Sequence, residues 1–438
     1  MTEKQIIKKA KENLSNIVNN INNNSQLYVK NKEVDFTRNR KMNLGDILKT
    51  MLSMEGGSVK SELLKISKYD VNLISSSGFS QQRDKITLDT FEFLFNEYTK
   101  ITKRNKTYNG YKLLACDGTT LHIAHNPNDK STYINSSKDG GKGYNSIHLN
   151  ALYDIMNHTY VDVVIQDIRQ SNEKNALITM MDRYNNQNNK TIIVADRNYE
   201  SYNIFAHAIE NNLKFAIRVK DISSSGILSS LNLPNKEFDK AFNFTLCSSG
   251  AKEYKNNIHN YKYIDKNYFD YKTNNMVIYP IEFRVVRFKI SENNYECIIT
   301  NLDSKEFPPI KIKELYHLRW GIETSFRELK YNIGITNFHS KKKEFIKQEI
   351  FIKLTMYNMC QAIMQQIVIK QRNTKYDYKI NAAIAFQLCK QYFREKSFSI
   401  KRLTTLIYKN LEAIRPDRKD KRKIKSKGSV SFTYRVAA

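Results

Sequence analysis

The order of short apolar segments between residues 111 and 220 limits the possible folds of this chain more than any other feature. Three strand-like runs, YKLLACDG, NSIHLNALYDI and TYVDVVIQDI, are separated by turns rich in Gly, Asn and Ser. A helical pattern follows, and then strand and helix alternate through TIIVAD, SYNIFAHAIENN and KFAIRVK. Three strands followed by alternating helices and strands are typical of a mixed α/β sheet with helices packed against it.

The rest of the chain divides around this segment. Residues 1–105 have apolar positions at helical spacing, which predicts a helical N-terminal domain. Residues 221–304 contain strand patterns without intervening helices, which predicts a β-rich antiparallel insertion. Residues 305–372 return to helix, and we expect them to form one core domain with residues 106–220. Residues 373–438 predict a helical C-terminal region with a basic tail.

The charge balance points to a polyanionic partner. The 438 residues include 71 Lys and Arg against 44 Asp and Glu, a formal net charge of +27. Such a surplus favours nucleic acid, whose phosphates attract a basic surface. For the N-terminal helices, DNA binding and an ordinary solvated face are equal alternatives, because no helix-turn-helix pattern is recognisable. The chain opens without a signal peptide and has no run near the roughly 18 apolar residues of a membrane span, so a cytoplasmic, nucleoid-associated protein is expected.

Two of the strand-like runs end in an aspartate, Asp117 in LLACDG and Asp196 in IIVADR. An aspartate at such a position often caps a turn or a following helix. In a basic protein the pair also suggests a second role, in which carboxylates hold divalent metal against phosphate. Two oxygen donors make an incomplete site, so a third carboxylate is expected from a distant helix.

The segment YHLRWGIETSFRELK, residues 316–330, supplies such a carboxylate. At roughly 100° per residue, one helix places Tyr316, Arg319, Glu323 and Lys330 within about 60° of one another. Glu328 lies roughly 140° from Glu323 and is predicted to point elsewhere. Arg319 and Glu323 also fit an ordinary i,i+4 ion pair of an exposed helix. A metal-ligating glutamate beside phosphate-binding cations explains the alignment of all four residues, which an isolated ion pair does not.

The spacing of these four residues, Y-(2)-R-(3)-E-(6)-K, resembles the signature of the insertion-sequence-4 family of bacterial DDE transposases. The stretches LACDGTT and VADRNYES are similar to that family's first and second aspartate regions. The stretches TRNRKMNLGDIL and SGFSQQRDKI are similar to its N-terminal segment. The resemblance implies a ribonuclease H-like catalytic core, whose strand order matches the pattern between residues 111 and 220, interrupted by a mostly β insertion.

The resemblance also implies a reaction. Asp117, Asp196 and Glu323 would be the catalytic triad and would bind two Mg²⁺ or Mn²⁺ ions. The implied chemistry is phosphodiester hydrolysis and transesterification, which nick the transposon end, form and reopen a DNA hairpin, and join the end to target DNA. The implied partners are the terminal inverted repeats, the target DNA and a second copy of the chain in a homodimer.

Five residues are expected to contact DNA by the same resemblance. Tyr316, Arg319 and Lys330 would bind the terminal phosphates near the cut, and Arg197 follows the second aspartate where a DNA contact is plausible. Some relatives stack a flipped base on an aromatic residue some twenty positions before the signature tyrosine, and Tyr295 is the candidate here. A tyrosine in a β segment is also an ordinary cross-strand packing residue, so both roles stay open.

Three neighbouring residues are predicted to be structural. Trp320, the single tryptophan, is expected to pack the helix against the core. His122 and His125 form a His-x-x-His pair, but no cysteine or third histidine lies near them in sequence, which favours a strand or loop role over zinc binding. The five cysteines lie far apart and are predicted to be reduced and buried.

Two alternative functions fit the same sequence. A structure-specific DNA metallonuclease would keep the fold and the carboxylates but would cut without strand transfer. A catalytically silent relic would bind DNA without cutting it, and the loss of a triad residue would be its expected mark. All three carboxylates are present.

Overall fold

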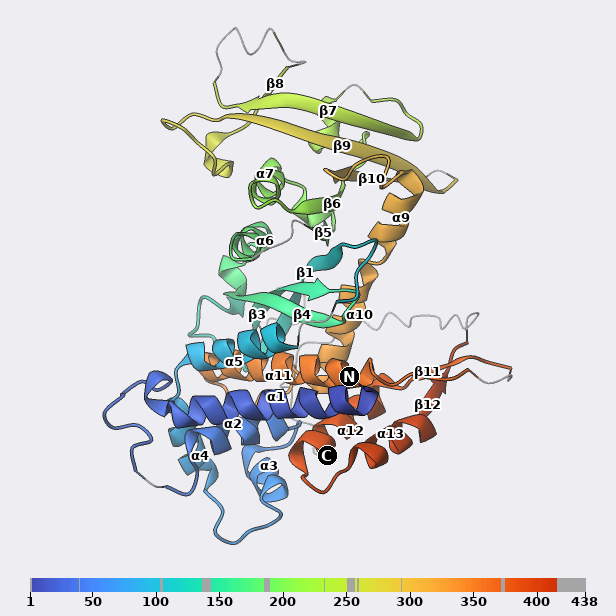
Figure 1. Cartoon of the computed structure of the whole chain (residues 1–438). Helices are drawn as coiled ribbons and strands as arrows, with labels where there is room; N and C mark the ends of the chain where they lie inside the picture. Colours follow the sequence, from blue (N-terminus) through green and yellow to red (C-terminus); the bar gives the residue numbers. More distant parts are fainter. Residues whose placement is uncertain are drawn as a thin grey trace.

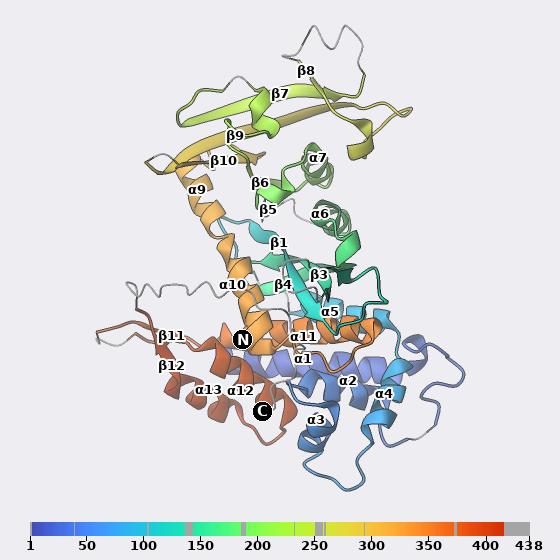
Figure 2. The same cartoon turned by 180° about the vertical axis from the view of Figure 1, so that it is seen from behind.

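The computed structural model of the chain describes residues 2–38, 40–102, 105–135, 143–184, 190–231, 233–249, 257, 260–292, 294–371 and 375–415. Helices from both ends of the chain form the base of the molecule, a sheet rises from them, and the longest strand lies at the far end (Figure 1; Figure 2 shows the reverse side). The predicted basic tail lies outside the described residues, except for Arg415. Among the helices that are described, none is both long and apolar enough to cross a membrane.

One sheet runs through the core domain. Its central strands are β1 (Lys112–Ile123), β3 (Tyr144–Asp154), β4 (Thr159–Asp167), β5 (Thr191–Ala195) and β6 (Lys214–Val219). They lie in the order β4-β3-β1-β5-β6, with β3 antiparallel to both of its neighbours and β1, β5 and β6 mutually parallel. The short strand β2 (Tyr133–Ile134) also pairs with β3. These directions and this order are those of a ribonuclease H-like core, so the predicted mixed α/β fold is confirmed.

The strands of the predicted insertion extend the same sheet. They are β7 (Phe238–Cys247), β8 (Tyr261–Tyr263), β9 (Ile278–Ser291) and β10 (Asn294–Thr300), in the order β6-β10-β9-β7-β8. β10 is antiparallel to β6 and to β9, and β9 is antiparallel to β7. The segment therefore covers the edge that β6 would otherwise expose.

Helices cover both faces of the core sheet. On one face α6 (Glu173–Asp182) and α7 (Tyr202–Glu210) pack over a cluster that includes Leu114 and Cys116 of β1. On the other face α5 (Leu88–Ile101) and α11 (Lys343–Met364) share a cluster with Leu113 and Ala115. Successive side chains of β1 point to opposite faces of the sheet, as in any strand. The face of each later β1 residue therefore follows from its position relative to these four.

The base gathers helices from both ends of the chain around α11 (Figure 1). From the N-terminal side come α1 (Glu3–Asn23), α2 (Leu44–Ser53), α3 (Val59–Ile66) and α4 (Ser76–Asp84). From the C-terminal side come α12 (Ala382–Arg394), α13 (Ile400–Lys409) and the strand pair β11 (Tyr378–Ile380) and β12 (Leu411–Ala413). Their apolar side chains belong to the same hydrophobic cluster as those of α11 and one face of the sheet, so the base and the sheet share a core.

A buried ion pair joins the N-terminal helices to α11. The Arg83 guanidinium of α4 donates to the Glu349 carboxylate at 2.9 Å and to the Gln348 side chain at 2.7 Å. The backbone amide of His339 donates to the other oxygen of Glu349 at 2.9 Å. Burial opposes ionisation of Glu349, but its hydrogen bonds with His339 and the charge of Arg83 outweigh burial and lower its pKa to about 2. Each nitrogen of the Arg83 guanidinium and each oxygen of the Glu349 carboxylate thus has a hydrogen-bond partner, as a buried charge pair requires.

We expect Glu349→Gln to destabilise the protein by about 3–5 kcal/mol, because it leaves the Arg83 charge buried without a counter-charge. The wild-type pair stabilises the fold above the unfolded-state pKa of 4.5, and that contribution is lost as the pH falls toward about 2. Urea unfolding midpoints between pH 6 and pH 3 measure both effects. Glu12→Gln, which breaks the exposed Lys8–Glu12 pair, is the control and should change stability by less than about 0.5 kcal/mol. Equal midpoints for the two variants would contradict this prediction.

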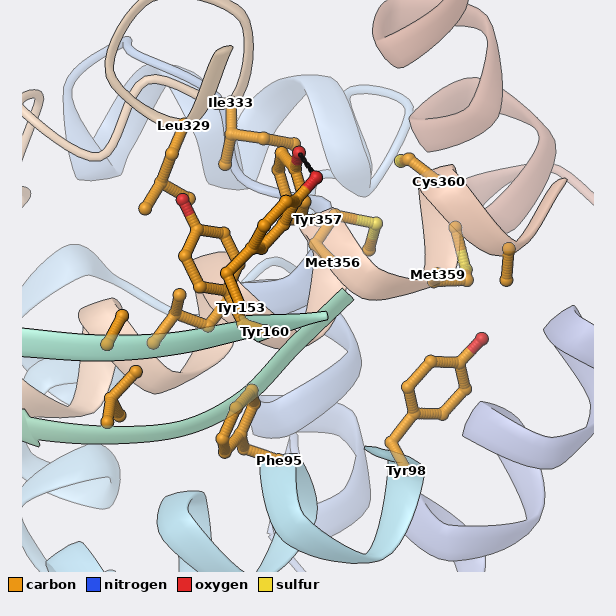
Figure 3. Close-up of a cluster of buried hydrophobic side chains, with 14 of the residues drawn as sticks. Phe95, Tyr98, Tyr153, Tyr160, Leu329, Ile333, Met356, Tyr357, Met359 and Cys360 are labelled. Atoms are coloured by element: carbon orange, nitrogen blue, oxygen red, sulfur yellow. Dashed lines mark hydrogen bonds between the residues drawn. The ribbon is translucent and has the colours of Figure 1, made fainter. Parts of the chain in front are cut away.

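Tyrosine side chains attach helix α10 (Trp320–Glu328) to the sheet. Three of them, Tyr153, Tyr160 and Tyr357, lie together in the core (Figure 3). The hydroxyls of Tyr160 on β4 and Ser325 on α10 lie 2.9 Å apart. The Tyr357 hydroxyl of α11 lies 3.1 Å from that of Tyr153 and donates to the Glu328 carboxylate at 2.9 Å. Glu328 therefore points into the core, which confirms the prediction that it faces away from Glu323.

We expect Tyr357→Phe to destabilise the protein by about 1–3 kcal/mol, because it leaves two buried partners, Tyr153 and Glu328, with one hydrogen bond fewer. Tyr408→Phe removes a half-exposed hydroxyl that donates to the Val368 carbonyl, and it should shift stability by about 0.5 kcal/mol at most. Urea unfolding of both variants checks the difference, and equal shifts would show that the buried hydroxyl network does not stabilise α10.

Candidate active site

The two aspartates lie side by side, but only Asp196 follows the end of its strand; the prediction that a strand ends at Asp117 is wrong, because β1 continues to Ile123. Cys116 of β1 pairs in parallel register with Ala195 of β5, so Asp117 and Asp196 are the next residues on strands about 4.8 Å apart. Ala115 and Val194 belong to the hydrophobic cluster on the α11 side, and by the two-residue period both aspartates face that side. The pairing of two parallel strands thus brings together carboxylates that are far apart in sequence.

Each aspartate also binds its own turn. Asp117 accepts a hydrogen bond from the Gly118 amide at 2.8 Å, and Asp196 accepts one from the Asn198 amide at 2.9 Å. The capping role that the sequence left open is therefore present at Asp196, at the start of the short helix η3 (Arg197–Tyr199). Burial raises the pKa of Asp117 to about 6, and the negative charges of Asp196 and Glu323 contribute to that increase. The three carboxylates are thus close enough to repel one another.

The segment that carries Glu323 is not one regular helix. α9 (Pro309–His317) ends before Leu318, α10 begins at Trp320, and a π-helical turn, η6 (Leu329–Ile333), follows. At the junction the amides of Arg319, Gly321 and Ile322 donate to carbonyls three residues back, at 2.9–3.1 Å. Such a tightened turn advances about 120° per residue, so the predicted regular spacing from residue 316 to residue 330 is wrong in detail.

The junction nevertheless keeps three of the four signature residues together. The Arg319 guanidinium donates to Glu323 at 2.9 Å and lies 5.6 Å from the centre of the Tyr316 ring. Tyr316 and Arg319 are buried, and the Glu323 side chain keeps 38% of its surface exposed. Arg319 also offsets part of the pKa increase of Asp117, which places its charge beside the aspartates. Lys330 lies on the π-helical turn, seven residues beyond Glu323.

Two buried polar atoms in this group have no hydrogen-bond partner among the described residues. They are the hydroxyl oxygen of Tyr316 and the Nε of Arg319. Buried donors are rarely left in this state, because an unmade hydrogen bond costs about 1–3 kcal/mol. Both belong to the signature, and Arg319 contacts both Tyr316 and Glu323, so the site has donors for which the described residues supply no acceptor.

Trp320 does not pack against the core, so that prediction is wrong. Its side chain is 56% exposed, and the Arg319 guanidinium lies 5.3 Å from its ring. The adjoining Arg319 side chain is the one that turns inward, and successive residues of the junction cannot both do so. The chain therefore presents a flat aromatic surface next to the carboxylates.

The other predicted residues lie around this centre. Arg197 is exposed in the turn after Asp196. Tyr295, on β10, is partly buried, and the Arg287 guanidinium covers its ring at 3.8 Å. His122 lies 3.0 Å from the Ser146 hydroxyl on β3, and His125 makes an edge contact with the ring of Tyr133. The two histidines thus contact the neighbouring β segments.

The carboxylates suit a hard divalent cation in kind, because Mg²⁺ and Mn²⁺ prefer oxygen donors. Within the described part of the chain, no three His, Cys, Asp or Glu side chains stand close enough to hold an ion as they are. Glu323 is turned to Arg319, and the repulsion that raises the pKa of Asp117 is what a cation would relieve. The residues fit a metal centre that is incomplete in the free chain.

Two polar residues near the aspartates were not predicted from the sequence. His148 of β3 and Glu173 at the start of α6 lie 3.0 Å apart, next to Gly118. They are far apart in sequence and match no motif. Only the pairing of β3 with β1 and the packing of α6 on the sheet bring them to the site.

Comparisons with known proteins agree with this geometry. Residues 108–359, more than half of the chain, match the family model described as Transposase DDE domain. A solved structure described as the cryo-EM structure of the piggyBac transposase synaptic complex with hairpin DNA is similar at 11% identity and a TM-score of 0.45, over 96% of this chain and 87% of that one. The curated proteins include no match. This chain belongs to the family of transposases with a DDE domain.

Proposed function

We propose that the chain is a DNA transposase of the insertion-sequence-4 type that acts on the terminal inverted repeats of its own element. Membership of the DDE transposase family makes it a metal-dependent DNA nuclease and strand transferase. The proposed ligands are Asp117, Asp196 and Glu323, which would hold two Mg²⁺ or Mn²⁺ ions. The spacing of Tyr316, Arg319, Glu323 and Lys330 supports the assignment to this branch of the family.

The observation that carries the proposal is the pair of unpartnered donors beside Glu323. The Tyr316 hydroxyl and the Arg319 Nε are buried, and no described residue accepts a hydrogen bond from them. A phosphate offers several acceptor oxygens and a negative charge, which match an arginine and a neighbouring hydroxyl. A DNA phosphate next to the carboxylates would satisfy both donors and place the scissile bond at the site.

Arg319 also links DNA binding to assembly of the site. Its guanidinium holds Glu323 at 2.9 Å, while no three carboxylates within the described residues are close enough to bind an ion. A phosphate that takes up the Arg319 charge would release Glu323 toward Asp117 and Asp196. Cations bound there would activate the attacking water or 3′ hydroxyl and stabilise the leaving oxygen. The free protein would accordingly cut poorly until an end is bound.

The surrounding residues would hold the rest of the DNA. Lys330 and the exposed Arg197 would contact backbone phosphates near the cut. Tyr295 would stack a flipped base once the Arg287 guanidinium moves from its ring, and the exposed indole of Trp320 offers a second stacking surface. The basic N-terminal helices would bind the outer part of each repeat, and two copies of the chain would pair two ends at the nucleoid.

The direct test uses a supercoiled plasmid that carries the DNA flanking the gene, incubated with the full-length protein and Mg²⁺. Wild type should give nicks and hairpin-capped ends, and Glu323→Gln should reduce both by at least about 100-fold. Glu314→Gln, an exposed glutamate of α9, is the control and should cut like wild type.

Products on denaturing and native gels separate the alternatives. Cleavage without joined ends would identify a metallonuclease, and binding without cleavage in wild type would identify a silent relic. Equal cleavage by wild type and Glu323→Gln would refute the proposed ligand.

A second prediction concerns the unpartnered hydroxyl. Tyr316→Phe should leave the urea midpoint of the free protein unchanged or raise it, because the lost hydroxyl has no partner among the described residues. The same change should weaken end binding by roughly 10- to 100-fold, the usual contribution of a hydrogen bond to a charged group. Tyr357→Phe, whose hydroxyl is partnered, should show the opposite pattern in stability. A fall in the stability of free Tyr316→Phe would mean that the hydroxyl serves the fold instead.

A further inference from the structure

Gly118, directly after the first aspartate, leaves a notch on the α6 side of the sheet. A Cβ at this position would lie 2.3 Å from the His148 Nε2 and 2.7 Å from a Glu173 oxygen. No real side chain tolerates such contacts, so a glycine is needed here for space. His148 and Glu173 therefore occupy the volume that any other residue after Asp117 would fill.

His148 and Glu173 form a close pair in this notch. The His148 Nε2 lies 3.0 Å from the Glu173 carboxylate, and the histidine side chain is only 10% exposed. The contact is not aligned as a hydrogen bond, so this buried nitrogen has no hydrogen-bond partner among the described residues. The interaction with His148 lowers the pKa of Glu173 below its usual range, with a smaller contribution from Asn198. The carboxylate is thus held in its charged form.

A second buried atom near the notch also has no partner. Asn150 lies opposite Gly118 in the register of β3 with β1, and its side-chain oxygen has no hydrogen-bond partner within the described part of the chain. Its amide nitrogen donates to Gln166 at 3.0 Å, so the side chain is held in place. Two fixed buried polar atoms beside a charged carboxylate indicate bound water or a hydrated ion more than a closed core.

The pair touches both aspartate turns. On one side it packs against Gly118, whose amide binds Asp117, and on the other Asn198 follows Asp196 by two residues. The neighbouring Lys174 donates to the Glu200 carbonyl at 2.8 Å, which fixes the start of α6 to the second turn. A carboxylate in this position adds negative charge directly behind the two aspartates while facing the opposite side of the sheet.

We propose that Glu173, held by His148, is a positioning residue of the metal centre that strengthens divalent cation binding at Asp117 and Asp196. It acts through its negative charge and through the backbone next to Asp117 and Asp196, and not as a direct ligand. A fixed charge outside the ligand set still contributes to cation binding, because it supports and orients the ligands. Such outer partners typically change metal affinity by about 10- to 100-fold. The inference rests on the proposed function of the two aspartates.

The test measures Mn²⁺ binding to the full-length protein with end DNA bound, from the electron paramagnetic resonance signal of the free ion, after subtraction of the ions that the same DNA binds alone. We expect Glu173→Gln to weaken binding by about 10- to 100-fold. We expect His148→Phe, which keeps a ring but removes its nitrogens, to weaken binding in the same direction. Asp182→Asn is the matched control, because Asp182 forms a similar pair with His207 at 2.8 Å at the other end of α6. It should bind Mn²⁺ like wild type.

Thermal unfolding separates positioning from folding. Glu173→Gln and Asp182→Asn should unfold at similar temperatures, and a much larger fall for Glu173→Gln would overturn the inference. Asp117→Asn distinguishes failure of this inference from failure of the proposed function. If Asp117→Asn weakens Mn²⁺ binding and Glu173→Gln does not, the inference is wrong and the proposed function stands. If wild type binds no Mn²⁺, or Asp117→Asn binds it unchanged, both are wrong.

Discussion

The parallel register of β1 with β5 is the constraint on which the site depends. Cys116 opposite Ala195 sets Asp117 beside Asp196 and turns both toward the α11 side of the sheet. A slip of one residue would move one carboxylate to the other face, because side chains alternate along a strand. The register is fixed by apolar side chains on both faces, since residues 113–116 and 192–195 are buried throughout. The chemistry is therefore positioned by the hydrophobic core.

Helix α10 is positioned by polar contacts in addition to its buried apolar residues Ile322 and Phe326. Tyr160 holds Ser325, and Tyr357 holds Glu328, both from the buried side. Two glutamates on one short helix thus have opposite environments. Burial raises the pKa of Glu328, which is bound by neutral donors, while Glu323 is partly exposed and bound by a guanidinium. The first ties the helix to the core, and the second is left where a cation can compete with Arg319 for it.

The features that were predicted from the sequence are those that depend on local residue patterns. The strand order of the core follows from apolar runs, and Glu323 was selected from a fixed spacing. The end of the apolar run at Asp117 was mistaken for the end of the strand, because β1 continues through polar residues to Ile123. The break at Leu318 was missed because helical periodicity carries no sign of a tightened turn. The attachment of β10 to β6 and the contact of His148 with Glu173 depend on pairing between distant segments. Trp320 was assigned to the core on its residue type, but its neighbour Arg319 takes the inward position.

Several buried polar atoms without a hydrogen-bond partner among the described residues lie near the two aspartates, and others, such as those of Gln26, Glu62 and Gln82, lie in the helical base. The Tyr316 hydroxyl, the Arg319 Nε, the His148 Nε2 and the Asn150 oxygen are all buried without hydrogen-bond partners among the described residues. Each would cost about 1–3 kcal/mol if it stayed unmatched. By contrast, the equally buried Arg83 and Glu349 bind each other and have further hydrogen bonds. The unmatched atoms of Tyr316 and Arg319 differ from those in the base in their position near Glu323, where a bound phosphate would supply the missing acceptor. Binding of DNA and cations would then recover stability that the free fold lacks, which couples assembly of the site to the presence of its substrate.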